Sequence, residues 1–197
     1  HDPYAPHAHR CPRCGEAHTG EAHDRWWAMG QQLWLAERAL HAAALHALRG
    51  APAHAAFAER VLDEAAEAYP RYPNRDNALG PTRPFFSTYL ESLWLLHLTL
   101  ALDLLEHARG DAVRALGARV RERLVAPSTA LIAGFPEGRS NRQAWNAAAR
   151  LAAAHLLGDR GAAEDAVHGA DGVAAVGDAG LLADGAWYEG ENYHQFA

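Results

Sequence analysis

The sequence predicts an all-α fold built from antiparallel helix pairs. Its 197 residues include 45 Ala but only one Ile, seven Val and five Thr. β-Sheets draw heavily on the β-branched residues, whereas helices favour Ala, Leu, Glu and Arg. Apolar side chains recur about every 3.6 residues between breaks that contain Gly or Pro, which is typical of amphipathic helices. About eight helices joined by short turns indicate a bundle, a solenoid or an (α/α) toroid.

The first predicted helix covers residues 26–48, where apolar side chains follow the helical period. Gly50 and Pro52 end this helix, and a second one is expected over residues 53–69. A Pro-rich loop, residues 69–84, comes next and is long for a compact domain. Loops of this length are often functional.

The third predicted helix, residues 85–108, is apolar nearly all round and is therefore expected to be buried. Gly110 separates it from a helix over residues 111–125, whose arginines we assign to a face in contact with solvent. Pro127 predicts the start of another short helix, which ends near Gly134.

A long helix is predicted over residues 141–157, because Ser140 and Gln143 have the spacing of a capping box. Two weaker helices follow, at about residues 160–169 and 172–182. The helices lack a strict sequence repeat, which weighs against a regular array of repeats.

We divide the chain at residue 24, into an irregular segment, residues 1–24, and a helical domain, residues 25–197. The first segment contains Cys11-Pro-Arg-Cys14-Gly15. Two thiols at this spacing are typical of one half of a tetrahedral zinc site, here a structural one. A disulfide, a redox pair or two reduced cysteines are the alternatives. The remaining ligands are sought among His7, His9, His18 and His23.

Charge and hydropathy exclude two classes of partner. The net charge is −6 and the isoelectric point is near 6.1, which argues against nucleic acid, because a phosphate-binding face is normally basic. No apolar run approaches the ~20 residues that a membrane-spanning helix needs.

Three segments at helix ends hold candidate functional residues. Arg83 precedes the buried helix, and its planar guanidinium can bind an anionic group. At the helix start after Ser140, free backbone N–H groups, the Asn141 amide and the Arg142 guanidinium form a candidate carboxylate site. Residues 184–194 combine aromatic rings, which suit sugar stacking, with Tyr and His, which suit proton transfer. The alternatives are a surface arginine, ordinary first-turn residues, and a turn whose Trp and Tyr pack into the core.

The last two segments resemble the helical domain of heparinase II/III-type polysaccharide lyases, a family that includes related alginate lyases. The resemblance also covers the Cys-Pro-x-Cys-Gly turn and the helix that begins Ser87-Thr88-Tyr89-Leu90-Glu91-Ser92-Leu93-Trp94. It implies an (α/α) toroid followed by C-terminal antiparallel β-sheet domains. Because this sequence holds no such β domains, we expect an incomplete toroid that is truncated at its C-terminal end. The most specific motifs are Ser140-Asn141-Arg142-Gln143-Ala144-Trp145 and Asp184-Gly185-Ala186-Trp187-Tyr188-Glu189-Gly190-Glu191-Asn192-Tyr193-His194.

The resemblance also implies catalytic roles. Asn141 matches the asparagine that neutralises the carboxylate of a uronic acid, and Tyr193 matches the general acid, which is also the base in some members. Many relatives have His directly after the asparagine, where this chain has Arg142. Arg142 and His194 are the candidates to favour ionisation of Tyr193. The residues assigned to substrate binding are Arg83, Trp145, Trp187, Tyr188, Glu189 and Glu191.

The expected function is therefore cleavage of a uronate-containing polysaccharide, alginate-like or heparin/heparan-like, by β-elimination. Catalysis requires no cofactor, and the expected partners are an acidic polysaccharide and the β-sheet domains of the same polypeptide. A secreted or periplasmic location follows from the polymeric substrate. The alternatives are a non-catalytic helical scaffold that binds glycan or protein, and a glycoside hydrolase whose two carboxylates come from Asp184, Glu189 and Glu191.

Overall fold

A computed structural model describes residues 4–73 and 79–190, and it is mostly helical, which confirms the all-α prediction. Within these residues, two short strands, β1 (His9–Arg10) and β2 (Ala17–His18), form an antiparallel pair. Short 3₁₀ turns cover Tyr69–Arg71 and Gly110–Val113, and a π turn covers Arg121–Val125. The α-helices are α1 (Glu21–Arg49), α2 (Pro52–Ala68), α3 (Thr88–Arg109), α4 (Arg114–Val120), α5 (Ala126–Ala133), α6 (Asn141–Leu157), α7 (Arg160–His168) and α8 (Val173–Gly180).

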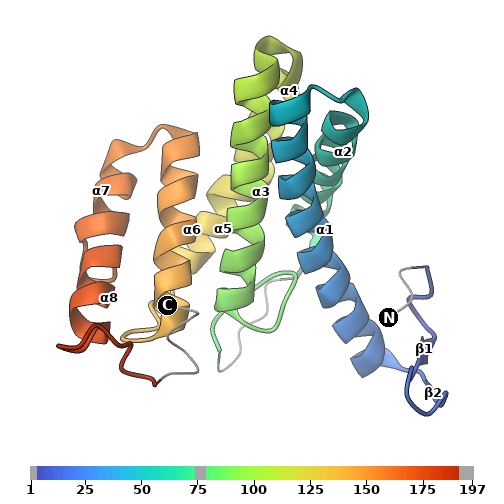
Figure 1. The fold of residues 1–197 in the computed structure, drawn as a ribbon, viewed down its shortest axis with the longest axis horizontal. Coiled ribbons are helices and arrows are strands. Elements are labelled where there is room, and N and C mark those ends of the chain that lie inside the picture. The colour runs from blue at the N-terminus through green and yellow to red at the C-terminus, as the bar shows by residue number, and fades with distance from the viewer. Residues whose placement is uncertain (1–3, 74–78, 191–197) are drawn as a thin grey trace.

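Three long helices define the arrangement. α3 packs against α1 on one side and against α6 on the other (Figure 1). All three run in the same direction, so their N-terminal ends lie together at the lower end of Figure 1. Helix α2 and the α4–α5 segment return behind them. Because a helix N-terminus carries a partial positive charge, this end of the molecule is suited to carboxylate groups.

The core lies mainly among α1, α2 and α3. Alanines such as Ala39, Ala43 and Ala58 are fully buried, and their small side chains allow the helices to approach closely. The rings of Tyr69 and Trp94 stack in this core with their centroids 5.9 Å apart. No helix in the described residues is long and apolar enough to cross a membrane.

The segment around Pro127 differs from the prediction of a separate short helix. α4, the π turn and α5 follow one another without a break from Arg114 to Ala133. Proline lacks an N–H and crowds the carbonyl one turn before it, which normally ends or kinks a helix. The wider π turn lies immediately before α5 and accommodates Pro127 without a loop.

The arginines of this segment match the prediction of a solvated face only in part, because Arg114 alone is mostly exposed and pairs with Asp111 beside it. Three of them reach across to α2 or α3, and each is half-buried between helices. The guanidinium of Arg121, for example, donates two parallel hydrogen bonds of 2.6 Å to the carboxylate of Glu106. Such bidentate pairs add geometric specificity to helix packing. The three pairs are Arg119 with Asp63, Arg121 with Glu106, and Arg123 with Glu67.

The N-terminal segment is more ordered than the sequence indicated. α1 begins at Glu21, so its first turn already contains residue 24, at which we divided the chain. His7 Nδ1 and His9 Nε2 lie 2.7 and 2.8 Å from the two carboxylate oxygens of Asp24. These hydrogen bonds lower the pKa of Asp24 and attach the strand pair to α1. The helical part of the chain therefore begins directly after Gly20.

Candidate active site

The N-terminus of α6 forms the centre of the candidate site. Ser140 has an extended backbone, and its hydroxyl accepts a hydrogen bond from the Gln143 N–H at 3.2 Å, which confirms the N-cap. In a capping box the Gln143 side chain would bond back to the Ser140 backbone N–H, but here it has other partners. The Gln143 side chain accepts from the Glu137 N–H and donates to the Asp171 carbonyl, so it fixes the loop before α6 and the turn before α8.

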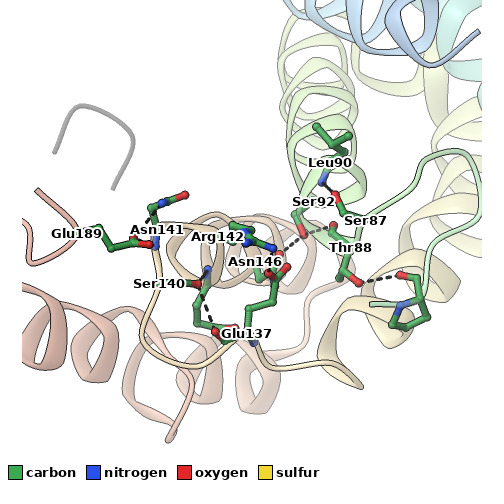
Figure 2. A network of polar contacts seen from close by, with 12 residues as sticks. Ser87, Thr88, Leu90, Ser92, Glu137, Ser140, Asn141, Arg142, Asn146 and Glu189 are labelled. Carbon is green, nitrogen blue, oxygen red and sulfur yellow. Dashed lines mark hydrogen bonds and ion pairs between the residues drawn. The ribbon is translucent and has the colours of Figure 1, made fainter. Parts of the chain in front are cut away.

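Asn141 is held by Glu189, from the segment after α8 (Figure 2). Glu189 Oε2 accepts hydrogen bonds from the Asn141 backbone N–H at 2.8 Å and from Asn141 Nδ2 at 2.9 Å. The same oxygen accepts from Trp187 Nε1 at 2.7 Å. Burial opposes ionisation of Glu189, but these hydrogen bonds and the nearby Arg142 outweigh it, so the pKa of Glu189 is lowered. An internal carboxylate thus occupies donors that the sequence suggested for a substrate.

Arg142 faces the other side of the helix start, toward α3, where its guanidinium donates to Glu137 at 3.1 Å. The Glu137 side chain is 6% exposed and that of Arg142 is 41% exposed. Burial raises the pKa of Glu137, although Arg142, Asn146 and the backbone N–H of Tyr89 partly oppose the shift. Tyr89 lies in the first turn of α3, so Glu137 joins the N-terminal ends of α3 and α6.

We expect the stability that Glu137 contributes to increase as the pH falls. Its pKa is higher in the folded chain than in the unfolded one, so the folded state binds the proton more tightly. This contribution is complete below the unfolded pKa of about 4.3 and is lost as the pH rises through the folded pKa. Urea unfolding of the wild type and Glu137→Gln at several pH values measures the difference. A difference that does not change between neutral and acidic pH would contradict the prediction.

The segment after α8 packs its aromatic residues inward. Leu181 and Trp187 form an isolated antiparallel bridge, and Trp187 is only 3% exposed. The Tyr188 hydroxyl donates to the Arg139 carbonyl, and the Arg139 guanidinium lies over the Tyr188 ring, 3.7 Å from its centroid. The Trp187 ring is thus buried, which favours the core-packing alternative over direct sugar stacking for it, whereas Tyr188 is only half-buried.

Gly180, the last residue of α8, has no side chain and so leaves room for the Trp187 ring. A Cβ at Gly180 would overlap that ring, whereas a Cβ at Gly177, one turn earlier, meets open space. We expect Gly180→Ala to destabilise the chain by about 2 kcal/mol through overpacking. Gly177→Ala should instead stabilise it by about 0.5–1 kcal/mol, because Ala is the better helix former. Thermal unfolding of both variants tests this pair, and equal effects would contradict it.

Arg83 lies in the loop before α3, against the core. Its guanidinium lies 5.4 Å from the centroid of the Tyr69 ring, and Nη1 donates to the Tyr72 carbonyl at 2.8 Å. Its backbone N–H donates to the buried carboxylate of Glu91, also at 2.8 Å. Arg83 also lines a groove, and part of its donor capacity is used within the chain.

This groove of about 800 Å³ lies between the first turns of α1 and the loop before α3. The Trp26 and Phe86 rings line it 5.4 Å apart, and they are 59% and 39% exposed. Two arginines line the groove, Arg83 and Arg25, and Arg25 is ion-paired with Glu21 on the same helix. The groove thus combines exposed aromatic surface with positive charge.

The remaining predicted site residues lie in different surroundings. Trp145 is half-buried on α6, one turn after Asn141. Asp184 is exposed and accepts a hydrogen bond from the Ala186 N–H in its own turn, at 3.0 Å. The predicted residues Tyr193, His194 and Glu191 lie outside the described residues.

The Cys11–Gly15 turn has features of a metal-binding knuckle. The Gly15 N–H donates to the Cys11 carbonyl at 2.9 Å, and both cysteines are free thiols. Backbone N–H groups of Cys14 and Arg13 lower the pKa of the Cys11 thiol, which favours the thiolate that a metal requires. Across residues 4–73 and 79–190, however, no three His, Cys, Asp or Glu side chains gather to hold a metal. The zinc site stays a prediction.

Sequence reasoning missed two acids that organise this end of the molecule. Glu91 is fully buried, and Glu137 is nearly so. Glu91 is the one Asp, Glu, Lys or Arg residue between positions 85 and 102, so its isolation in an apolar helix is a signal that could have identified it. Glu137 has no comparable signal, because it lies in a turn.

Comparison with known proteins assigns no family. No family model matches the chain, and no curated protein matches it. The resemblance of the two segments therefore rests on their motifs.

Proposed function

We propose that this chain is the helical part of a polysaccharide lyase that cleaves a uronate-containing polysaccharide by β-elimination. The observation that carries the proposal is the pair of hydrogen bonds between Asn141 and Glu189, 48 residues apart. They join the two segments that resemble the lyase family most specifically. Glu189 precedes Tyr193 by four positions in the sequence.

The chemistry of β-elimination suits these residue types. Removing the proton from C5 of a uronic acid places additional negative charge next to its carboxylate. A hydrogen-bond donor on that carboxylate, here the Asn141 amide, stabilises the charge as it develops. Arg142 is paired with Glu137 on the other side of the helix start and adds positive charge nearby. In the proposed reaction a general base takes the C5 proton, a role that Tyr193 would fill as its phenolate, as in some members of the family. The C4–O bond then breaks as the double bond forms, and the neutral Tyr193 phenol protonates the departing glycosidic oxygen.

The groove beside α3 supports an acidic sugar as the substrate. Arg83 carries the charge opposite to that of a uronate, whereas Arg25 is already paired with Glu21. The exposed Trp26 and Phe86 offer rings for stacking. Phe86 lines the groove, and Tyr89 follows three residues later, in the first turn of α3. The Tyr89 backbone contacts Glu137, which is the partner of Arg142. The groove and the α6 N-terminus therefore lie on either side of the N-terminal end of α3.

The hydrolase alternative has weaker support. Among its three candidate acids, Glu189 is held by three donors that lower its pKa, which does not suit a general acid. The parallel course of α1, α3 and α6 with return helices behind them fits part of an (α/α) toroid. In the proposal, β-sheet domains complete the cleft, and the protein acts outside the cytoplasm, where such polymers occur.

The test is to mix the full-length protein with a panel of acidic polysaccharides, including alginate and heparan sulfate, and to follow near-ultraviolet absorbance. β-Elimination leaves a 4,5-unsaturated product that absorbs there, so a rise with one polymer would support the proposal. New reducing ends without such a rise would instead indicate hydrolysis. Binding without either product would indicate a glycan-binding scaffold.

A further inference from the structure

We propose that Glu189 is a positioning residue, which holds the Asn141 amide in the orientation that the lyase reaction needs. This role rests on the proposed function and adds a residue to it. The sequence had suggested substrate binding for Glu189, whereas the structure commits its carboxylate to internal donors.

Glu189 restrains the backbone and the side chain of Asn141 at the same time. Glu189 Oε2 accepts from the backbone N–H and from Nδ2 of the same residue, so the amide plane is fixed relative to the start of α6. An amide nitrogen carries two hydrogens, and only one of them is used by Glu189. The second Nδ2 hydrogen then has a defined direction in which it can donate to a substrate carboxylate.

Glu189 is itself held in place. The indole N–H of Trp187 donates to the same oxygen, and the Trp187 ring is buried against Gly180 at the end of α8. The backbone bridge between Leu181 and Trp187 closes this turn. The carboxylate is thus attached to buried scaffold on both sides, which is what a group that orients a neighbour requires.

A competing role is that Glu189 blocks the site, by occupying the place of the substrate carboxylate until it is displaced. The two roles predict opposite changes in KM. Removing a blocking carboxylate would tighten substrate binding and lower KM. Removing a positioning carboxylate would leave KM nearly unchanged and lower kcat, because the donor matters most as charge develops in the transition state.

The experiment compares Glu189→Ala, Glu189→Gln and the wild type in the full-length protein, on the polysaccharide that gives turnover. We expect kcat to fall about tenfold to hundredfold in Glu189→Ala, as for a displaced catalytic group. Glu189→Gln keeps an oxygen acceptor and should lose less. The matched control is Glu164→Gln, which neutralises a mostly exposed carboxylate on α7 and should match the wild type.

The Trp187 indole N–H resonance reports on the contact separately from activity. It should move in Glu189→Ala and stay nearer its wild-type position in Glu189→Gln, with Trp187→Phe used to assign it. Unchanged kcat in both variants while that resonance moves would overturn the positioning role alone. A lower KM in Glu189→Ala would overturn it in favour of the blocking role. A wild type without β-elimination on any uronate would overturn the proposed function, and this role with it.

Discussion

Replacing Glu91 by Ala is expected to destabilise the chain by about 4 kcal/mol, because buried donors that lose their acceptor cost about 1–3 kcal/mol each and partly relax. Glu91 is fully buried on α3. Its carboxylate joins the 3₁₀ turn after α2, the loop before α3, and α5. The four donors are the Tyr69 hydroxyl, the Thr82 hydroxyl at 2.7 Å, the Arg83 backbone N–H at 2.8 Å and the Ser128 hydroxyl at 2.8 Å.

Urea unfolding followed by far-ultraviolet circular dichroism measures this loss. Glu122→Ala is the control, since Glu122 is exposed and its replacement should change stability by no more than about 0.5 kcal/mol. Glu91→Gln keeps one oxygen acceptor but presents an NH₂ group to donors, so we expect an intermediate loss. A loss below about 1 kcal/mol in Glu91→Ala would show that the four donors find other partners.

Glu91→Ala should disturb the loop before α3 as well as lower the stability, because Glu91 accepts hydrogen bonds from two residues of that loop. Thr82 and Arg83 would lose their shared anchor, and Arg83 and Phe86 line the groove proposed for the substrate. Burial and the neighbouring Glu91 carboxylate also raise the pKa of Tyr69, which keeps its hydroxyl a donor. One buried acid thereby connects the core to the shape of the groove.

Local signals in the sequence predicted the helices well where the ends are defined by the chain itself. The predicted helix 141–157 has the bounds of α6, because Ser140 caps its start and Gly158 adopts the left-handed conformation at its end. Pro127 failed as a break because the π turn before it absorbs the distortion. That turn depends on the surrounding packing, which a local rule does not include.

The candidate site was predictable as two segments but not as an assembly. The sequence identified Asn141 and Arg142 as donors, and it also identified the segment that contains Glu189. It did not show that Glu189 and Glu137 would occupy those donors, because such pairing depends on the tertiary arrangement. The contact between Asn141 and Glu189 spans 48 residues, a separation at which helical periodicity gives no information.

Asn141→Ala is expected to lower kcat for β-elimination by about 10²–10³-fold, the effect of removing one preorganised donor to a developing negative charge. KM should change much less, because the donor stabilises the transition state more than the bound substrate. The backbone N–H of residue 141 still donates to Glu189, so the fold should persist. The missing side-chain hydrogen bond should lower the free energy of unfolding by about 1 kcal/mol. Near-ultraviolet absorbance on the active polysaccharide measures the rate.

Asn141→Asp separates the role of the amide donor from that of side-chain shape. Aspartate has nearly the same size, yet it donates nothing and places a second carboxylate beside Glu189. If the side chain only fills space, Asp should retain more activity than Ala. If it neutralises the substrate carboxylate, Asp should be at least as inactive as Ala, since it repels both Glu189 and the substrate. His155→Ala, at an exposed position near the far end of α6, should keep wild-type kcat and shows that the effect belongs to the helix start.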